Sequence, residues 1–197
     1  RYGFQLPNLS IGRDNSGEWA LLSSPTPGQD NKTPSMLATS SNLVINEWMS
    51  NGRGDDWIEL HNPRAMPVKM DGMYLTDDLS SIGLTQFEIP QLNYIAAGGF
   101  VKWIADANLA KGGDHVNFSL ASLGEPIALY SRTKSLVDKR EISITTPGES
   151  EGRLPDGATR ITKFPSTPTP GKSNYLPVEN VVINEVLTHT DPPFEDA

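Results

Sequence analysis

The chain has 197 residues, among them no cysteine, 16 lysines and arginines, and 24 aspartates and glutamates, which gives a formal charge of −8. The missing cysteines exclude disulfides, thiolate metal sites and a cysteine nucleophile, and the acidic balance argues against a general phosphate-binding surface. No apolar run approaches the roughly 18 residues of a membrane-spanning helix. The chain begins at Arg1 without an initiator methionine or a signal peptide, so we expect it to be part of a longer protein.

Short runs of β-branched and aromatic residues follow one another along the chain and are separated by Gly, Pro and Asp turns. Alternation within these runs places Ile58 with Leu60, and Ile142 with Ile144, on one face each. Eight or nine mostly antiparallel strands of this kind predict an all-β sandwich, with a single helical turn at residues 106–111. The predicted strands are residues 43–48, 56–61, 73–76, 85–89, 99–104, 116–119, 126–130, 140–144 and 159–164.

Three sequence blocks occur twice, roughly 140 residues apart, which is a sign of repeated units. We interpret the first two blocks as the end of a repeated unit and the third as the beginning of one. The order of the blocks along the chain therefore fixes where each unit begins and ends, which we call the repeat frame. The blocks are Gly-Arg at residues 12–13 and 152–153, Pro-Thr-Pro-Gly at 25–28 and 168–171, and Asn-(Leu/Val)-Val-Ile-Asn-Glu at 42–47 and 180–185.

This frame divides the chain into four parts. Residues 1–31 are interpreted as the C-terminal remnant of a preceding unit, 32–40 as a linker, 41–174 as a complete unit, and 175–197 as a linker with the opening strand of a following unit. Residues 1–24 and 181–186 would then be strands without their sandwich, with unpaired backbone edges. We expect them to pair with the central unit, with each other, or with a neighbouring molecule by strand exchange.

Four blocks, in this order, resemble the lamin tail domain, the immunoglobulin-like sandwich of nuclear lamins and of many secreted bacterial proteins. The resemblance covers residues 43–174 and implies an immunoglobulin-like β-sandwich of about 8–9 strands. It is carried by Leu-Val-Ile-Asn-Glu at 43–47 with Asp-Trp-Ile-Glu-Leu-His-Asn at 56–62, by residues 67–78, by Ile-Ala-Ala-Gly-Gly-Phe at 95–100, and by the closing segment 152–157 with 168–171.

The sequence offers no catalytic motif. His61, His115 and His189 are scattered and lack the spacing of zinc ligands, and neither a nucleophile elbow nor a phosphate-binding loop occurs. We therefore predict no catalytic residues, no metal site and no cofactor, and a chain that is not an enzyme. The binding residues cannot be named from the sequence.

Two features of the sequence leave open a binding role, one for a calcium ion and one for an adhesion receptor. The acidic residues of the first half are predicted to be solvated, although a calcium ion between the turns at Asp55-Asp56 and Asp77-Asp78 is an alternative. Arg53-Gly54-Asp55 spells a tripeptide recognised by animal integrins, but Gly and Asp are also natural turn residues. The acidic residues considered are Glu47, Asp55, Asp56, Glu59, Asp71, Asp77 and Asp78.

Basic residues gather in one predicted hairpin, at Arg132, Lys134, Lys139 and Arg140. The overall charge and the lack of interleaved aromatic residues argue against nucleic-acid binding there. We expect no nucleic-acid binding and no membrane insertion. We expect the partner to be a protein or a surface polysaccharide.

The function that these observations favour is a non-catalytic spacer or interaction module in a larger protein. The family resemblance implies a secreted or cell-surface protein of bacterial type. One alternative is an accessory domain of an extracellular enzyme whose catalytic domain lies elsewhere in the protein, and another is a calcium-dependent cell-wall or carbohydrate adhesion module.

Overall fold

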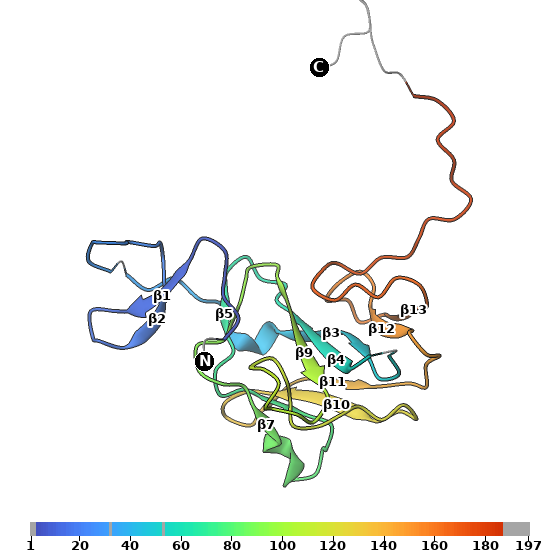
Figure 1. Ribbon diagram of the computed structural model, residues 1–197, viewed down its shortest axis with the longest axis horizontal. Helices are drawn as coiled ribbons and strands as arrows, with labels where there is room; N and C mark the ends of the chain where they lie inside the picture. Colours follow the sequence, from blue (N-terminus) through green and yellow to red (C-terminus); the bar gives the residue numbers. More distant parts are fainter. Residues whose placement is uncertain (1–2, 32, 53, 187–197) are drawn as a thin grey trace, which may run out of the picture.

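The computed structural model describes residues 3–31, 33–52 and 54–186, and nearly all of its regular structure is β-strand. Two antiparallel sheets enclose one core (Figure 1), which confirms the predicted all-β, immunoglobulin-like sandwich. The first sheet has the order β13-β12-β3-β4-β9. Its strands are β3 (Val44–Met49), β4 (Asp56–His61), β9 (Phe100–Ala105), β12 (Ser150–Arg153) and β13 (Ile161–Phe164).

The second sheet has the order β11-β10-β6-β7, and two short strands, β5 and β8, pair separately. Two turns of 3₁₀ helix, η1 (Ser40–Asn42) and η2 (Gly83–Thr85), are the only helical elements in the described residues, and none of these is long and apolar enough to cross a membrane. The remaining strands are β5 (Val68–Lys69), β6 (Tyr74–Thr76), β7 (Phe87–Glu88), β8 (Tyr94–Ile95), β10 (Pro126–Tyr130) and β11 (Leu136–Glu141).

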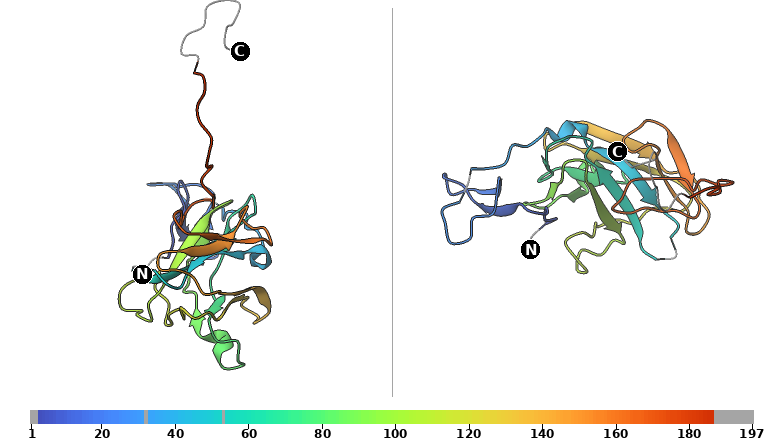
Figure 2. Two further views of the ribbon diagram at one scale, coloured as in Figure 1. Left: turned by 90° about the vertical axis from the view of Figure 1, so that its right-hand side faces the viewer. Right: turned by 90° about the horizontal axis from the view of Figure 1, so that it is seen from above.

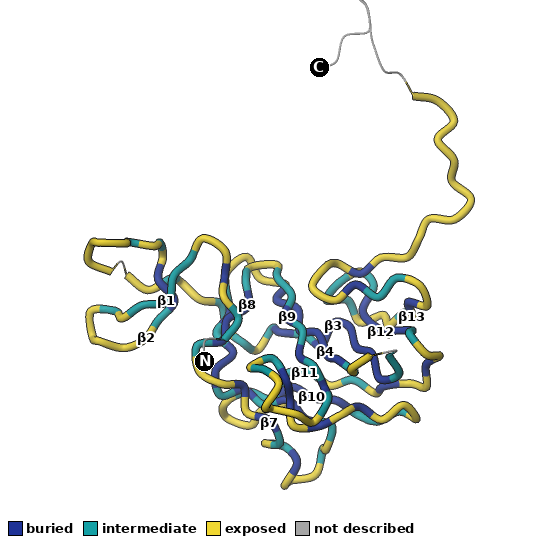
Figure 3. Tube along the Cα trace, viewed as in Figure 1, coloured by how far each residue is buried: buried dark blue, intermediate teal, exposed yellow. Residues whose placement is uncertain are grey.

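The core lies between the two sheets. Ile58 and Leu60 of the first sheet and Leu75 and Ile127 of the second are fully buried and belong to one cluster, and each contributes roughly 1.5–3 kcal/mol by leaving water. Strand β4 is also buried on its other face, where Glu59 has no exposed surface. Figure 3 shows that burial in the first sheet is continuous along β3 and β4, so these two central strands are covered on both sides.

Three local expectations are wrong. Residues 106–111 form a turn without helix, and residues 116–119 make only isolated bridges, such as Asp106 with Ser119. Strand β11 ends at Glu141 rather than continuing, so the alternation stops: Ile142 is buried but Ile144 is 63% exposed. Here the chain leaves the sheet to reach β12, and a periodicity read from side chains cannot detect that departure.

The N-terminal hairpin, β1 (Ser10–Arg13) with β2 (Trp19–Leu22), is a separate two-stranded sheet. It stands off one end of the sandwich, whereas β12 and β13 lie at the other end (Figures 1 and 2). Its own small core joins Leu21 to Tyr94 of the sandwich. The preceding residue Phe4 packs edge-on against Trp103, with ring centroids 5.1 Å apart.

Residues 175–186 leave the sandwich as an extended, exposed segment (Figure 3) and form no strand. The expected pairing of the two ends with a neighbouring molecule therefore stays a prediction. Within the chain, β1 pairs with β2, and Leu22 forms an isolated bridge with Pro34.

Candidate functional site

The most unusual chemistry in the described residues is a cluster of three carboxyl groups, from the buried Glu47 and Glu59 and the half-buried Asp156, which we call the carboxylate cluster. Glu47 of β3 and Glu59 of β4 are register partners on adjacent strands, and neither has exposed surface. A bulge between Ile45 and Glu47 changes the register there. Like charges placed directly opposite each other destabilise a sheet, so the cluster needs compensating hydrogen bonds.

Glu47 is bound by two residues that lie far along the chain, Ser150 and Thr169. Ser150 Oγ donates to Glu47 Oε1 at 2.5 Å, and the Thr169 backbone N–H lies 3.1 and 3.2 Å from the two carboxylate oxygens. The Thr169 hydroxyl lies 3.1 Å from Glu47 Oε2 and 2.7 Å from Asn174 Oδ1. The opening strand is thereby tied to a turn that follows it by 122 residues.

Glu59 and Asp156 complete the cluster. Gly171 N–H donates to Glu59 Oε2 at 2.5 Å, and Asn46 Nδ2 lies 3.3 Å from Glu59 Oε1 and 2.9 Å from Asp156 Oδ1. Gly157 N–H donates to Asn46 Oδ1 at 3.0 Å. The Asn46 amide thus connects two carboxyl groups and one backbone N–H.

Burial sets the protonation state of Glu59. Loss of solvation raises the pKa of Glu59 from 4.5 to about 8, so this carboxyl group is mostly neutral at pH 7. Desolvation also raises the pKa of Glu47, although bonds from Ser150 and Thr169 oppose that change. A neutral Glu59 beside Glu47 avoids a buried pair of like charges.

Perturbed carboxyl groups often mark catalytic sites, but Glu47 and Glu59 have no access to solvent. Glu47 and Glu59 are fully buried and their oxygens already accept bonds from the closing segment. We therefore assign the cluster to joining β3 and β4 to the turn at residues 169–171. The expectation that Glu47 and Glu59 are solvated is wrong, because residues 169–174 cover the outer face of the sheet.

A buried arginine supports the same joint. Arg153 Nε donates to Ile45 O at 2.8 Å, and its Nη2 lies 2.7 Å from Asp138 Oδ2, which also accepts Ile45 N–H at 2.8 Å. The guanidinium thus connects β12, β3 and β11. We did not predict this network, although the recurrence of Gly-Arg was a signal that could have identified it.

The N-terminal hairpin repeats part of this arrangement without its carboxylates. Asn31 Nδ2 donates to Arg13 O at 2.8 Å, as Asn174 Nδ2 donates to Arg153 O at 2.9 Å. The turn bond from Gln29 N to Thr26 O likewise matches that from Lys172 N to Thr169 O. The sequence blocks 12–31 and 152–174 therefore share hydrogen bonds as well as residues.

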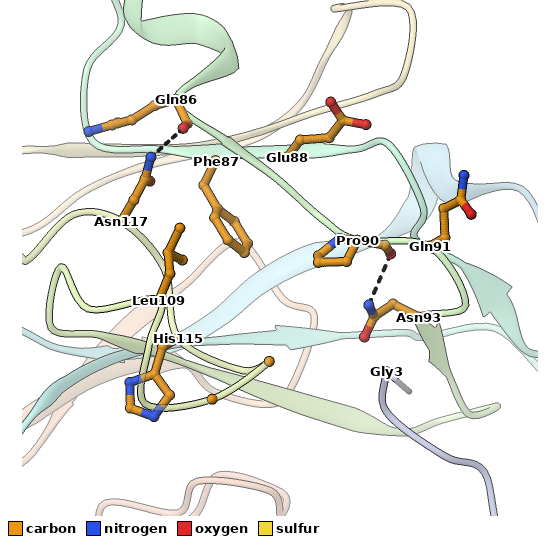
Figure 4. Close-up of a pocket in the computed structure, with 12 residues that line it drawn as sticks. Gly3, Gln86, Phe87, Glu88, Pro90, Gln91, Asn93, Leu109, His115 and Asn117 are labelled. Atoms are coloured by element: carbon orange, nitrogen blue, oxygen red, sulfur yellow. Dashed lines mark hydrogen bonds between the residues drawn. The ribbon is translucent and has the colours of Figure 1, made fainter. Parts of the chain in front are cut away.

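A pocket of about 490 Å³ lies between residues 86–93 and the loop 109–117 (Figure 4). Phe87 and Leu109 lie between Asn117 on one side and Asn93 on the other. Asn117 Nδ2 donates to Gln86 O at 2.7 Å, and Asn93 Oδ1 accepts Phe4 N–H at 3.0 Å. The N-terminal segment therefore forms part of this pocket wall.

The acidic turns are engaged locally. Asp55 pairs with Lys111 at 3.7 Å, Asp56 begins β4, and Asp78 accepts Ser80 N–H at 2.8 Å. The described residues contain no group of three or more acidic or histidine side chains that could hold a metal ion. Arg53 of the Arg-Gly-Asp tripeptide lies outside the described residues.

The histidines and the basic hairpin also have local partners. His61 stacks on Phe100, and burial lowers its pKa, while His115 Nδ1 lies 3.0 Å from Asp106 Oδ1. Arg140 pairs with Asp138 at 3.0 Å. His189 lies outside the described residues.

Residues 37–143, more than half of the chain, match the family model of the lamin tail domain, an immunoglobulin-like, non-catalytic domain family. The match begins before η1 and ends after β11, so that β12 and β13 lie beyond it. No curated protein matches the chain.

Proposed function

Since the chain belongs to the lamin tail domain family, we propose that it is a non-catalytic module of a larger secreted or cell-surface bacterial protein, where it acts as a structural spacer or interaction domain. The single observation that supports this proposal is the shared hydrogen bonding of residues 12–31 and 152–174. A chain that carries two closing segments and two opening sequences suits a series of similar units, each joined by its own closing segment.

The proposal includes the division of the chain. Residues 1–31 close a preceding unit, 32–40 link it to a complete unit at 41–174, and 175–197 lead into the next. Pairing of β12 with β3 supports a unit that extends beyond the family match, because it puts the closing segment into the same sheet as the opening strand.

Antibodies raised against this chain would test the size and place of the whole protein. We expect an immunoblot of the source organism to show a band well above 21.5 kDa, in the extracellular or surface fraction and sensitive to protease added to intact cells. A band of 21.5 kDa that stays inside the cells would contradict the proposal.

Replacing the domain would then show whether it acts as a spacer or as an interaction domain. Residues 41–174 would be replaced in the whole protein by an unrelated sandwich of similar length. Retained surface display and partner binding indicate a spacer, whereas loss of one bound partner indicates a specific interaction. If the whole protein contains a catalytic domain whose substrate binding drops after the exchange, the accessory role is the correct form of the proposal.

The pocket of about 490 Å³ favours a second candidate, recognition of a small amphipathic ligand such as a sugar. Phe87 and Leu109 supply apolar surface, and Asn117 and Gln91 supply polar groups at its edge. A glycan array probed with the chain and with an Asn117→Ala variant tests it. Retention that the variant loses supports adhesion, and no retention on any glycan or cell-wall preparation contradicts it. The array is run with calcium and with chelator, to test the calcium-dependent form.

A further inference from the structure

A hollow of about 330 Å³ lies beside β1 of the N-terminal hairpin, lined by Ser10, Ile11, Leu22, Pro25, Thr26, Pro27 and Asn31. Within the described residues, β1 has a neighbouring strand on one side only, β2. The hydroxyl oxygen of Thr26 is buried and has no hydrogen-bond partner there. A buried polar atom left without a partner costs free energy, so the hollow lacks a group that would bond to it.

The repeat identifies that group. Ser10, Thr26 and Asn31 correspond in the repeat to Ser150, Thr169 and Asn174. In the complete unit, Ser150 and Thr169 hold the carboxylate of Glu47, and Asn174 Oδ1 accepts from the Thr169 hydroxyl at 2.7 Å. The hollow therefore corresponds to the place that a glutamate side chain fills at the other end of the sandwich.

The backbone edge is equivalent as well. Strand β3 runs antiparallel to β12, with Glu47 opposite Gly152 and Trp48 opposite Glu151. A side chain at position 152 would lie 2.6 Å from Asn46 O, so glycine permits the close approach of that strand. Gly12 occupies the same place in β1, and Asn31 already makes the bond to Arg13 that Asn174 makes to Arg153.

We propose that β1 and the hollow beside it bind a β-strand of the type Val-Ile-Asn-Glu, with the glutamate carboxylate bound by Ser10 and Thr26. The occupant is residues 180–186 of a second copy of this chain. This sequence occurs twice in the chain: residues 42–47 are built into the sandwich, whereas Val181, Val182 and Ile183 are 70%, 80% and 83% exposed. By the register of β3, Glu185 lies opposite Gly12, and Val186 opposite Ile11.

Binding of this kind joins different surfaces of two copies, so successive copies associate head to tail. This inference rests on the repeat frame of the proposed function. Its test uses the purified chain alone, so a failure of strand binding is distinguishable from a failure of surface location or of size in cells.

A labelled peptide with the sequence of residues 180–186 is titrated against the chain and followed by fluorescence anisotropy. The control peptide exchanges the last Asn and Glu, which keeps composition and charge but moves the carboxylate away from the hollow. We expect saturable binding that is at least about tenfold weaker for the control, since a charge-assisted hydrogen bond is worth about that much. Equal binding of the two peptides overturns the proposal.

Two hairpin variants locate the site. Thr26→Val and Ser10→Ala each weaken binding of the 180–186 peptide by a similar factor, while Ser16→Ala in the hairpin turn leaves it unchanged. Because the Thr26 hydroxyl is unpartnered in the free chain, Thr26→Val keeps or raises the melting temperature, so lost binding does not reflect lost folding. Binding that neither variant weakens overturns the site. NMR amide shifts that appear on peptide addition at β9, an edge strand of the first sheet, instead of at β1 also overturn it.

Sedimentation velocity tests the second copy as occupant. The chain associates as its concentration rises, and Glu185→Gln or Thr26→Val shifts the association to at least about tenfold higher concentration. Glu179→Gln, in the same exposed segment, is the matched control and leaves association unchanged. A chain that remains monomeric at millimolar concentration overturns the second copy as occupant.

Discussion

The two hairpins β1–β2 and β12–β13 share Ser-x-Gly-Arg in their first strands and Pro-Thr-Pro-Gly after their second strands, but they have very different surroundings. Around β12 and β13, Arg153 is buried against Ile45 and Asp138. In the N-terminal hairpin, Arg13 is exposed, donates to Gly17 O at 2.6 Å and lies 5.0 Å from the centre of the Trp19 ring. The same sequence block therefore supports a core in one place and folds as an isolated hairpin in the other, depending on whether an opening strand is present.

Some hydrogen bonds occur in both hairpins, and these show which contacts of the repeated sequence block form within the segment itself. Bonds from Asn31 to Arg13 and from Asn174 to Arg153 form within each segment and need no partner strand. Bonds to the carboxylate form only where Glu47 is supplied. The local bonds thus position the residues that surround the carboxylate, and the bonds to the carboxylate form when a strand such as β3 supplies a glutamate.

Substitution of the two arginines is expected to give the largest difference in the free energy of unfolding between the hairpins. Arg153→Met should lower the free energy of unfolding by about 3 kcal/mol, because it removes the buried guanidinium from Ile45 O and from the carboxylate of Asp138, which keeps only Arg140 as an ion partner. Arg13→Met should lower it by less than about 1 kcal/mol, since its contacts are exposed. Urea unfolding of both variants measures the difference, and equal losses would mean that the two surroundings do not matter.

The next difference concerns pH. Glu59 has a raised pKa in the fold, so the folded chain holds a proton that the unfolded chain releases above about pH 4.5. Its stabilising contribution is complete below that pH and declines by a few kcal/mol as the pH rises to about 8. Glu59→Gln keeps the neutral form and should flatten this decline.

Urea unfolding at pH 5, 6, 7 and 8 measures that change. Comparing the variant with the parent chain at each pH cancels the opposite contribution of His61, whose pKa burial lowers. If both proteins lose stability with pH at the same rate, Glu59 is not the group that holds the proton.

A smaller difference is expected at the two threonines. Thr169→Val removes a hydroxyl that contacts Glu47 and Asn174, and should cost about 1–3 kcal/mol. Thr26→Val removes a hydroxyl without a partner, and should change stability by less than about 0.5 kcal/mol or increase it. Thermal unfolding of the pair is sufficient, and a larger loss for Thr26→Val would show that the hairpins are not related as described.

The smallest effect is expected at the exposed copy of the glutamate. Glu185→Gln in dilute solution should leave unfolding within about 0.5 kcal/mol of the parent chain, because the side chain is exposed. Glu47→Gln is the matched buried variant and should be clearly destabilised, because it disturbs the bonds from Ser150 and Thr169. Similar unfolding curves for the two variants would contradict the assignment of the carboxylate cluster.

Much of the sandwich could be predicted from the sequence, because β-strands such as β4 and β10 carry dense apolar residues between clear turn signals. The carboxylate cluster could not. Glu47 and Glu59 sit on the face of the sheet that alternation assigns to solvent, and they are covered by residues that follow Glu47 by 122 positions and Glu59 by 112. Periodicity describes a strand and its neighbours, and it carries no information about a turn that returns from so far along the chain.

The repeat was more informative than the local pattern. Recurrence of Gly-Arg, Pro-Thr-Pro-Gly and Asn-Glu marked residues that the structure gathers at one joint, although their roles were not predicted. The pocket beside Phe87 had no sequence signal, since its walls come from the N-terminal segment and two separate loops.

The position of residues 169–174 has a mechanical consequence. This turn is the last part of the chain bound to the sandwich before the extended segment 175–186. A pulling force transmitted along that segment would first load the bond from Thr167 Oγ1 to Tyr175 O, then Asn174, and then the bonds from Thr169 to Glu47 and from Gly171 to Glu59. These bonds share the load between two neighbouring strands, β3 and β4, so a stretched protein would be held at this turn before any strand of the core is disturbed.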